Sequence, residues 1–229
     1  MPTIVFASPK GGAGKTTAAL ILACELARAK PVIVLDADPN RPMRVWAEGN
    51  RVPQNLTIIS DVNEDNIVDR IETAAAQAPF VVVDLEGTAA KIVLLALSQA
   101  DLAIVPTQGS QLDAEQAARA IKAIRDAERV TRRHLPYCVL LTRTNPAIRT
   151  RSTAHVWNTL NNASIPMLDA ELNEREAFRA MFAFRAPLEA LDPNLVANLD
   201  KARTNAQEFA AEVVENLRRE LPNAAERAA

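Results

Sequence analysis

The stretch SPKGGAGKTT (residues 8–17) contains half of the six glycines in the chain. These glycines are Gly11, Gly12 and Gly14. An apolar, β-rich run precedes them and a helix-like run follows, and backbone N–H groups in such a turn can wrap phosphate oxygens. Lys15 would then reach the outer phosphates, and the Thr16 hydroxyl would ligate Mg²⁺. The stretch therefore predicts a site for a nucleotide with Mg²⁺.

Strand-like and helix-like runs alternate along the whole chain. The strand-like runs are short and mostly apolar throughout, which is typical of strands buried on both faces of a parallel sheet. They span residues 3–8, 31–36, 56–60, 80–84, 102–106, 137–142 and 165–168. The helix-like runs span residues 16–29, 64–78, 88–99, 113–133, 151–162 and about 196–220. This order predicts an α/β fold with a doubly wound, mostly parallel sheet flanked by helices.

Length and composition restrict the class of protein. The 229 residues, 48% of them hydrophobic, are enough for a real core, and we expect one domain over residues 1–220 with a flexible tail over residues 221–229. Cys24 and Cys138 form no C-x-x-C pair, so we expect buried thiols in a reducing compartment. No apolar run approaches the ~18 residues of a membrane span, and the start has no basic segment or cleavage site. We therefore expect a cytoplasmic protein without a membrane partner.

The glycine-rich stretch departs from the common phosphate-loop pattern G-x-x-x-x-G-K-[ST]. Pro9 stands where the first glycine belongs, and a second lysine, Lys10, follows it. Spacing alone leaves open whether Lys10 has a function or is a solvated loop lysine. The run KGGAGKTT is the deviant Walker A motif, and with it the chain resembles the ParA/MinD family of P-loop ATPases. Within that family it looks most like the short ParA proteins of DNA partition and their T-strand-processing relative.

The resemblance implies ATP and Mg²⁺ as ligands and slow ATP hydrolysis. It also implies that Lys10 reaches the phosphates held by the partner subunit, so that ATP joins a sandwich homodimer. The nucleotide-binding residues would be Lys10, Gly11, Gly12, Ala13, Gly14, Lys15, Thr16, Thr17 and Pro106. The ATP-bound dimer would bind double-stranded DNA without base specificity, lie on the nucleoid, and drive partition of plasmid or chromosomal DNA with a ParB-like adaptor.

Three carboxylates follow two of the predicted strands. Asp36 and Asp38 end the run VIVLDADP, and alternation along a strand places both on one face. In the run FVVVDLEG, Asp84 follows four apolar residues, where a Walker B carboxylate holds Mg²⁺. The resemblance implies that Asp38 orients the attacking water, which makes it catalytic together with Lys10 and Lys15. It places Asp36 and Asp84, with Thr16, near the metal, while a role for Glu86 stays open.

The run DLAIVPTQGSQLDAEQA (residues 101–117) resembles the family segment that lines the nucleotide and the dimer face. Pro106 and Asp113 are the matched positions. Asp113 also fits a simpler interpretation as a helix N-cap.

Basic residues gather in one part of a chain whose formal net charge is only −2. Residues 119–151 hold nine basic residues against Asp126 and Glu128, a net charge of +7, so the rest of the chain carries −9. Such asymmetry indicates an anion-binding surface. The candidates for DNA binding are Arg119, Lys122, Arg129, Arg133, Arg143, Arg149 and Arg151. For any one of these arginines, an ordinary solvated position remains the simpler interpretation.

Two other classes of protein share the predicted fold. A MinD-like ATPase that positions material at a membrane or in protein clusters would carry a basic, bulky amphipathic C-terminal helix, and the mixed-charge, alanine-rich end argues against it. A metabolic ATP-dependent enzyme would leave the basic segment unexplained. The predicted function is therefore that of a partition ATPase, with these two as alternatives.

Overall fold

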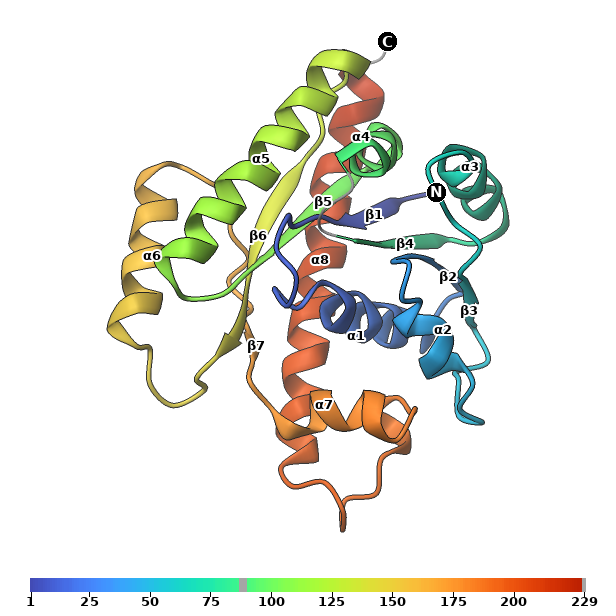
Figure 1. The fold of residues 1–229 in the computed structure, drawn as a ribbon, viewed down its shortest axis with the longest axis vertical. Coiled ribbons are helices and arrows are strands. Elements are labelled where there is room, and N and C mark those ends of the chain that lie inside the picture. Colours follow the sequence, from blue (N-terminus) through green and yellow to red (C-terminus); the bar gives the residue numbers. More distant parts are fainter. Residues whose placement is uncertain (87–89, 228–229) are drawn as a thin grey trace.

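The computed structural model describes residues 1–86 and 90–227, in which seven parallel strands form the central sheet (Figure 1). The strands are β1 (Thr3–Phe6), β2 (Val32–Ala37), β3 (Leu56–Ile59), β4 (Phe80–Leu85), β5 (Leu102–Thr107), β6 (Tyr137–Thr144) and β7 (Leu172–Asn173). Their order across the sheet is β3-β2-β4-β1-β5-β6-β7. The doubly wound parallel sheet predicted from the sequence is confirmed.

Helices cover both faces of the sheet. They are α1 (Lys15–Ala27), α2 (Pro42–Ala47), α3 (Ile67–Gln77), α4 (Ala90–Gln99), α5 (Gln111–Thr131), α6 (Arg151–Asn162), α7 (Glu176–Ala183) and α8 (Leu199–Arg227). Buried residues of α1, α2, α7 and α8 pack in one core, and those of α3, α4, α5 and α6 pack in the other. Alternate strand residues enter opposite cores: Ile4 and Phe6 lie in the first, Val5 in the second. Burial on both faces explains why the strands are apolar throughout.

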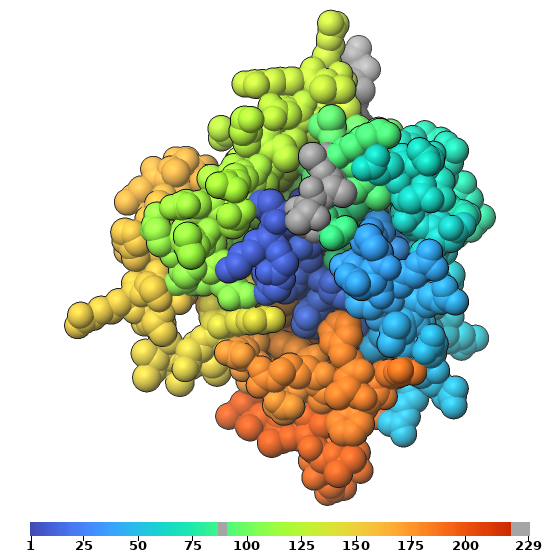
Figure 2. Space-filling model, viewed as in Figure 1, coloured from blue at the N-terminus to red at the C-terminus, as the bar shows by residue number. Residues whose placement is uncertain are grey.

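The position of β1 sets the place of a ligand site. After β1 the chain forms β2, β3 and β4 on one side of β1, and then β5, β6 and β7 on the other side. Ligands of open α/β sheets bind beyond the carboxyl ends of the strands at such a change of direction. The glycine-rich stretch follows β1 at this point. Figure 2 shows this dark-blue segment at the centre of one face of the molecule.

Three expectations about the elements differ from the structure. The seventh strand is Leu172–Asn173, and residues 165–168 make only a single parallel bridge, between Met167 and Val139. Pairing stops there because the Glu212 carboxylate accepts the N–H groups of Asp169 and Ala170 that a longer strand would use.

Two short helices, α2 and α7, are absent from the sequence prediction, because helices of six and eight residues show too little periodicity. Helix α8 runs to Arg227, past residue 220 where the sequence predicts its end. Residues 228 and 229, and residues 88 and 89 of the expected 88–99 helix, lie outside the described part of the chain.

Candidate functional site

The loop between β1 and α1 has the backbone conformation of a phosphate cradle. Gly12 and Gly14 have φ angles of 79° and 94°, which residues with a side chain rarely adopt. Gly14 precedes Lys15, the first residue of α1, and no side chain caps this helix. The first N–H groups of a 13-residue helix, with the positive end of its dipole, therefore face the loop. This arrangement binds anions, as the sequence predicts.

Two hydrogen bonds from distant strands hold the loop in place. Gln108, which follows β5, donates from Nε2 to the carbonyl oxygen of Gly12 at 2.7 Å. Thr142 of β6 donates from Oγ1 to the carbonyl oxygen of Ala13 at 2.8 Å. Both residues stand near the carboxyl ends of β5 and β6, on one side of β1, and were not predicted from the sequence. Only the order of the strands in the sheet brings them to the loop.

Lys15 lies inside the cradle. Its residue is 7% exposed, and its Nζ donates to the carbonyl oxygen of Lys10 at 3.1 Å. Burial lowers the pKa of Lys15, and the charges of Asp84, Asp38 and Glu86 oppose that shift. Lys15 thus lies at the loop within the influence of three carboxylates, and a lysine in this position suits contact with a polyphosphate.

The Lys10 side chain contacts the start of α5 and not the loop. Its Nζ contacts Oδ1 of Asp113 at 2.7 Å, and its side chain is 40% exposed whereas that of Asp113 is 4% exposed. Burial by itself would raise the pKa of Asp113, but the bonds from Lys10 and Ser110 outweigh burial and hold it below its ordinary value. The N-cap of α5 is Ser110, so the interpretation of Asp113 as an N-cap is wrong. Asp113 instead links the start of α5 to the glycine-rich loop.

The two buried aspartates lie opposite each other on neighbouring strands. Asp36 of β2 is in register with Asp84 of β4. Both carboxylate oxygens of Asp84 are buried without a hydrogen-bond partner among the described residues, and so is Oδ1 of Asp36. Burial raises the pKa of Asp84 to about 7. The Thr16 hydroxyl and the charge of Lys15 oppose that shift. A buried carboxylate without a well-formed hydrogen bond is costly, which fits a side chain that awaits a cation.

The protein supplies only part of a metal site. Within residues 1–86 and 90–227, no three His, Cys, Asp or Glu residues form a metal-binding group. Oδ2 of Asp36 already accepts the N–H groups of Met43 and Arg44, at 3.0 and 3.1 Å, and so positions α2. Asp84 and Thr16 therefore remain the residues best suited to Mg²⁺, with phosphate and water oxygens completing its shell.

Asp38 and Glu86 lie at the carboxyl ends of the same two strands. Asp38 follows β2, and its Oδ1 accepts the backbone N–H of Asn40 at 2.8 Å, which shapes the turn before α2. Both carboxylates influence the pKa of Lys15, so they lie on the phosphate side of the sheet. Asp38 therefore lies near Lys15, and its expected role in orienting the attacking water stays a prediction.

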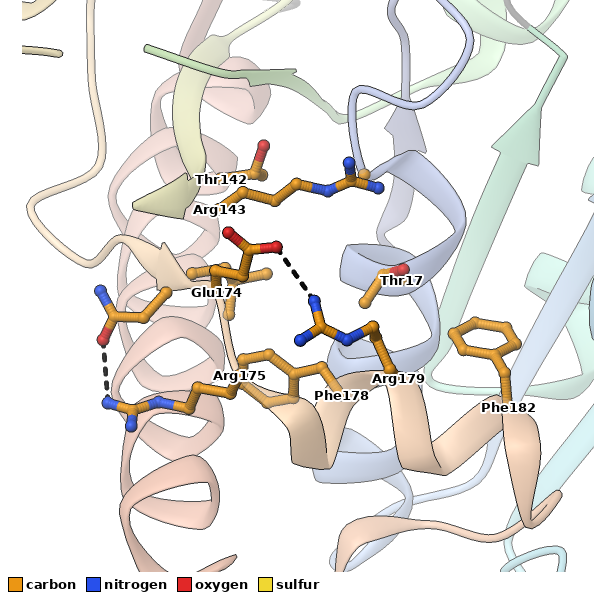
Figure 3. Close-up of a pocket in the computed structure, with 11 residues that line it drawn as sticks. Thr17, Thr142, Arg143, Glu174, Arg175, Phe178, Arg179 and Phe182 are labelled. Atoms are coloured by element: carbon orange, nitrogen blue, oxygen red, sulfur yellow. Dashed lines mark hydrogen bonds and ion pairs between the residues drawn. The ribbon is translucent and has the colours of Figure 1, made fainter. Parts of the chain in front are cut away.

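A pocket of about 340 Å³ continues the cradle on the side of β6 and α7 (Figure 3). Gly14 and Thr17 line its inner end, and Phe178 and Phe182 line the α7 side. Its charged residues are Arg143, Glu174, Arg175 and Arg179. Arg179 bonds Glu174 at 2.9 Å, while Arg143 extends across the opening toward α1. Apolar rings with a few polar groups are typical of a ligand pocket.

The pocket residues outside the loop were missed from the sequence, because α7 itself was missed. The one signal for them is the spacing of Phe178 and Phe182, which places both on one face of a helix. Pro106, an expected nucleotide contact, is buried in β5 in register with Leu140 and does not line this pocket.

The predicted DNA-binding residues fall into two separate groups. Arg119, Lys122 and Arg129 are exposed on α5, and Arg133 follows that helix. The remaining three lie at the other end of the sheet: Arg143 at the pocket, Arg149 before α6, and Arg151 at its start. Arg149 pairs with Glu171 and stands 5.5 Å from the ring centroid of Trp157. The structure does not bring all seven to one surface.

Known proteins are similar to this chain in sequence and in fold. The family model described as VirC1 protein matches residues 1–218. The protein ParA of Rhizobium radiobacter is 38% identical over 218 residues, 95% of this chain and 98% of that protein. Protein virC1 of Rhizobium rhizogenes is 28% identical over 187 residues, 79% of this chain and 80% of that protein.

Solved structures are similar at lower identity. A plasmid partition protein from Borrelia burgdorferi bound to AMPPNP has a TM-score of 0.70 at 19% identity, covering 93% of this chain and 98% of that one. The septum site-determining protein MinD from Pyrococcus horikoshii with Mg-ADP has a TM-score of 0.71 at 17% identity, covering 93% and 95%. These likenesses show the fold of ParA/MinD-type P-loop proteins.

Proposed function

The chain belongs to the VirC1 protein family, with the fold of ParA/MinD-type P-loop ATPases, and from this premise we propose that it is a partition ATPase. It binds ATP with Mg²⁺, dimerises around the nucleotide, binds DNA without base specificity and hydrolyses ATP slowly. The observation that carries the proposal is the uncapped N-terminus of α1 beside Lys15 and the unpartnered carboxylate of Asp84.

Different residues of the site bind the phosphates, hold the metal and orient the attacking water. The amides of residues 11–16 and the ammonium of Lys15 bind the phosphates, and Thr16 and Asp84 hold Mg²⁺. The metal supplies positive charge against the oxygens of the transferred phosphoryl group. Asp38 orients the attacking water at the carboxyl end of β2. Phosphoryl transfer needs mainly such positioning and charge, so turnover without a stimulating partner is slow.

The pocket beside the cradle accepts the rest of the nucleotide. It opens from Gly14 and Thr17, where the phosphates begin, toward the two phenylalanine rings of α7. A nucleobase is a flat aromatic group, and rings of this kind offer it stacking surface. We assign the base and ribose of the nucleotide to this pocket. In this assignment Pro106, which the resemblance places at the nucleotide, does not contact it.

Lys10 connects the nucleotide to the homodimer. In the isolated subunit its ammonium contacts Asp113. Its partial exposure leaves it able to turn outward, toward phosphates held by a second subunit across the carboxyl edge of the sheet. A contact available with ATP and lost with ADP makes the dimer depend on the nucleotide.

Support for DNA partition comes from the basic residues and from the names of relatives. The similar proteins include ParA of Rhizobium radiobacter and a plasmid partition protein of Borrelia burgdorferi. A ParB-like adaptor would stimulate hydrolysis and release the DNA, so the ATP-bound protein lies on the nucleoid. No helix in the described residues is long and apolar enough to cross a membrane.

One further observation favours a second cargo. Maintenance of carboxysome distribution protein A from Halothiobacillus neapolitanus is 26% identical over 179 residues. A relative with that name indicates that the same machinery can position a protein cluster instead of DNA. Both cargoes use the same ATP cycle, so only the partner would differ.

The test is binding of the protein to a DNA duplex of random sequence with ATP, with ADP and without nucleotide, all with Mg²⁺. Lys15→Ala and Lys10→Ala run beside the wild type, with nucleotide binding measured separately. We expect tight DNA binding only with ATP, and its loss in both variants, with nucleotide binding kept in Lys10→Ala. Nucleotide binding without any DNA binding would overturn the partition function and leave the ATPase.

A further inference from the structure

Helix α5 and the two residues that follow it carry six basic side chains, and all six are exposed. We name this surface the α5 basic face, and its residues are Arg119, Lys122, Arg125, Arg129, Arg132 and Arg133. Between residues 119 and 133 only Asp126 and Glu128 oppose them, a net charge of +4. Figure 2 shows side chains of this end of α5 projecting from the body at the top of the molecule. The positive charge is therefore directed toward solvent.

The few acidic groups nearby neutralise only part of this charge. Asp126 is shared between Lys122, at 3.9 Å, and Arg129, at 3.4 Å. The Glu128 carboxylate turns inward and accepts the N–H of Leu135 while it contacts His134. Exposed pairs of this kind are weak and exchange readily with other anions.

Arg133 differs from the other members, because it holds the end of α4. It contacts Asp101 at 3.4 Å and donates to the carbonyl oxygens of Ser98 and Ala100. Three of the others, Arg125, Arg129 and Arg132, line a depression of about 480 Å³ at the end of α5 together with Arg133. Glu128 and His134 complete its lining.

The spacing of the α5 basic face fits a phosphate backbone. Residues three or four apart on a helix stand about 4.5–6 Å apart along its axis, and the helical part of the face, from Arg119 to Thr131, is about 18 Å long. Duplex DNA carries one charge per ~1.7 Å, so it presents about ten phosphates over that length. An acidic protein partner fits less well, because protein interfaces depend on apolar anchors and Val130 is the one large apolar side chain exposed here, among the described residues.

We propose that the α5 basic face is the DNA-binding surface, and that it is complete within one subunit. This rests on the DNA binding proposed above and names its site. All six residues of the face belong to one chain, and the end of α5 stands about 27 Å from Asp113 at its start. The face therefore does not need the dimer to assemble it. A monomer binds DNA weakly, and ATP strengthens binding by joining two faces.

The test compares two variants that each remove three positive charges. The first is Arg125→Gln/Arg129→Gln/Arg132→Gln, which spares Arg133 and its structural contacts. The matched control is Lys30→Gln/Lys201→Gln/Arg218→Gln, whose exposed residues lie on or next to α1 and α8 in the other helical layer. Anisotropy of a labelled random duplex is measured at several salt concentrations, with ATP-Mg and with ADP-Mg.

We expect the first variant to bind DNA at least 10-fold more weakly with ATP, and the slope of log K against log salt to fall by up to about 5, because each phosphate contact adds about 0.9 and the dimer loses six of them. The control stays within about twofold of wild type. Lys10→Ala keeps weak binding with ATP, and the three α5 substitutions abolish that binding too. Unchanged melting temperature and ATP binding exclude misfolding.

Two results would overturn the inference. If the first variant binds DNA like the wild type, the surface is wrong, while the proposed DNA function stands. If the wild type binds no duplex but binds polyglutamate through these three arginines, the face docks an acidic protein, and the partition function fails with it.

Discussion

Lys10 Nζ and Asp113 Oδ1 lie 2.7 Å apart and join the glycine-rich loop to the start of α5. The pair links residues 103 positions apart in the chain. If Lys10 contacts a second subunit, as proposed above, its side chain must first leave Asp113. Breaking this contact would then be part of the free-energy change of dimerisation.

Removing the charge of Asp113 should therefore favour the dimer. In Asp113→Asn we expect the ATP concentration for half-maximal dimerisation to fall about 2–10-fold, since a partly exposed ion pair contributes about 1 kcal/mol. Sedimentation velocity with increasing ATP measures it. Asp126→Asn, on the same helix, is the control and should change nothing. An unchanged or higher ATP requirement in Asp113→Asn would contradict this role.

Asp84 should make the metal-free protein sensitive to pH. Burial raises its pKa to about 7, so the folded protein keeps a proton that the unfolded chain releases near pH 4. Stability then falls as pH rises from about 4 to 7, and levels off above that range.

The isosteric Asp84→Asn variant removes this effect. Without Mg²⁺ we expect it to melt about 2–8 °C above wild type at pH 8 and close to wild type at pH 5. It should also lose the stabilisation by Mg-ATP. Differential scanning calorimetry at both pH values tests this, with the exposed Asp69→Asn as control. A variant less stable than wild type at pH 8 would show that the carboxylate has a partner.

The glycines of the loop should differ in tolerance. Gly14 has φ 94° and a Cβ there would stand 3.4 Å from Thr142, whereas a Cβ on Gly11 would meet nothing within 4 Å. Gly14→Ala should cost about 1–2 kcal/mol in folding and weaken ATP binding at least tenfold. Gly11→Ala should keep its melting temperature. Calorimetry with nucleotide titration measures both, and equal effects of the two substitutions would contradict the assigned conformations.

Phe182 should contact the nucleoside and not the phosphates. Phe182→Ala is expected to weaken ATP and ADP binding equally, by about 5–20-fold, because stacking on one ring contributes about 1–2 kcal/mol. Binding of inorganic triphosphate should stay the same. The control is Phe184→Ala, since Phe184 is exposed and does not line the pocket. Loss of triphosphate binding would mean that the loop itself had been disturbed.

Patterns among residues close together in sequence determined the fold class and the central residues of the site. Alternating apolar runs require a parallel sheet covered on both faces, and the glycines before Lys15 require a loop at a helix N-terminus. Asp36, Asp38 and Asp84 end buried strands, and parallel strands present these ends at one edge. Such features depend on near neighbours in sequence, so they could be predicted without the tertiary structure.

Tertiary structure alone decided which distant residues meet. Strand order brings Gln108 and Thr142 to the loop and pairs Lys10 with Asp113. Packing of the short helix α7 places two phenylalanines in the pocket. The sequence does not predict this helix, because eight residues show too little periodicity. The same packing separates the basic residues of α5 from those beside β6. Long-range contacts of this kind depend on how the layers stack, which no local pattern encodes.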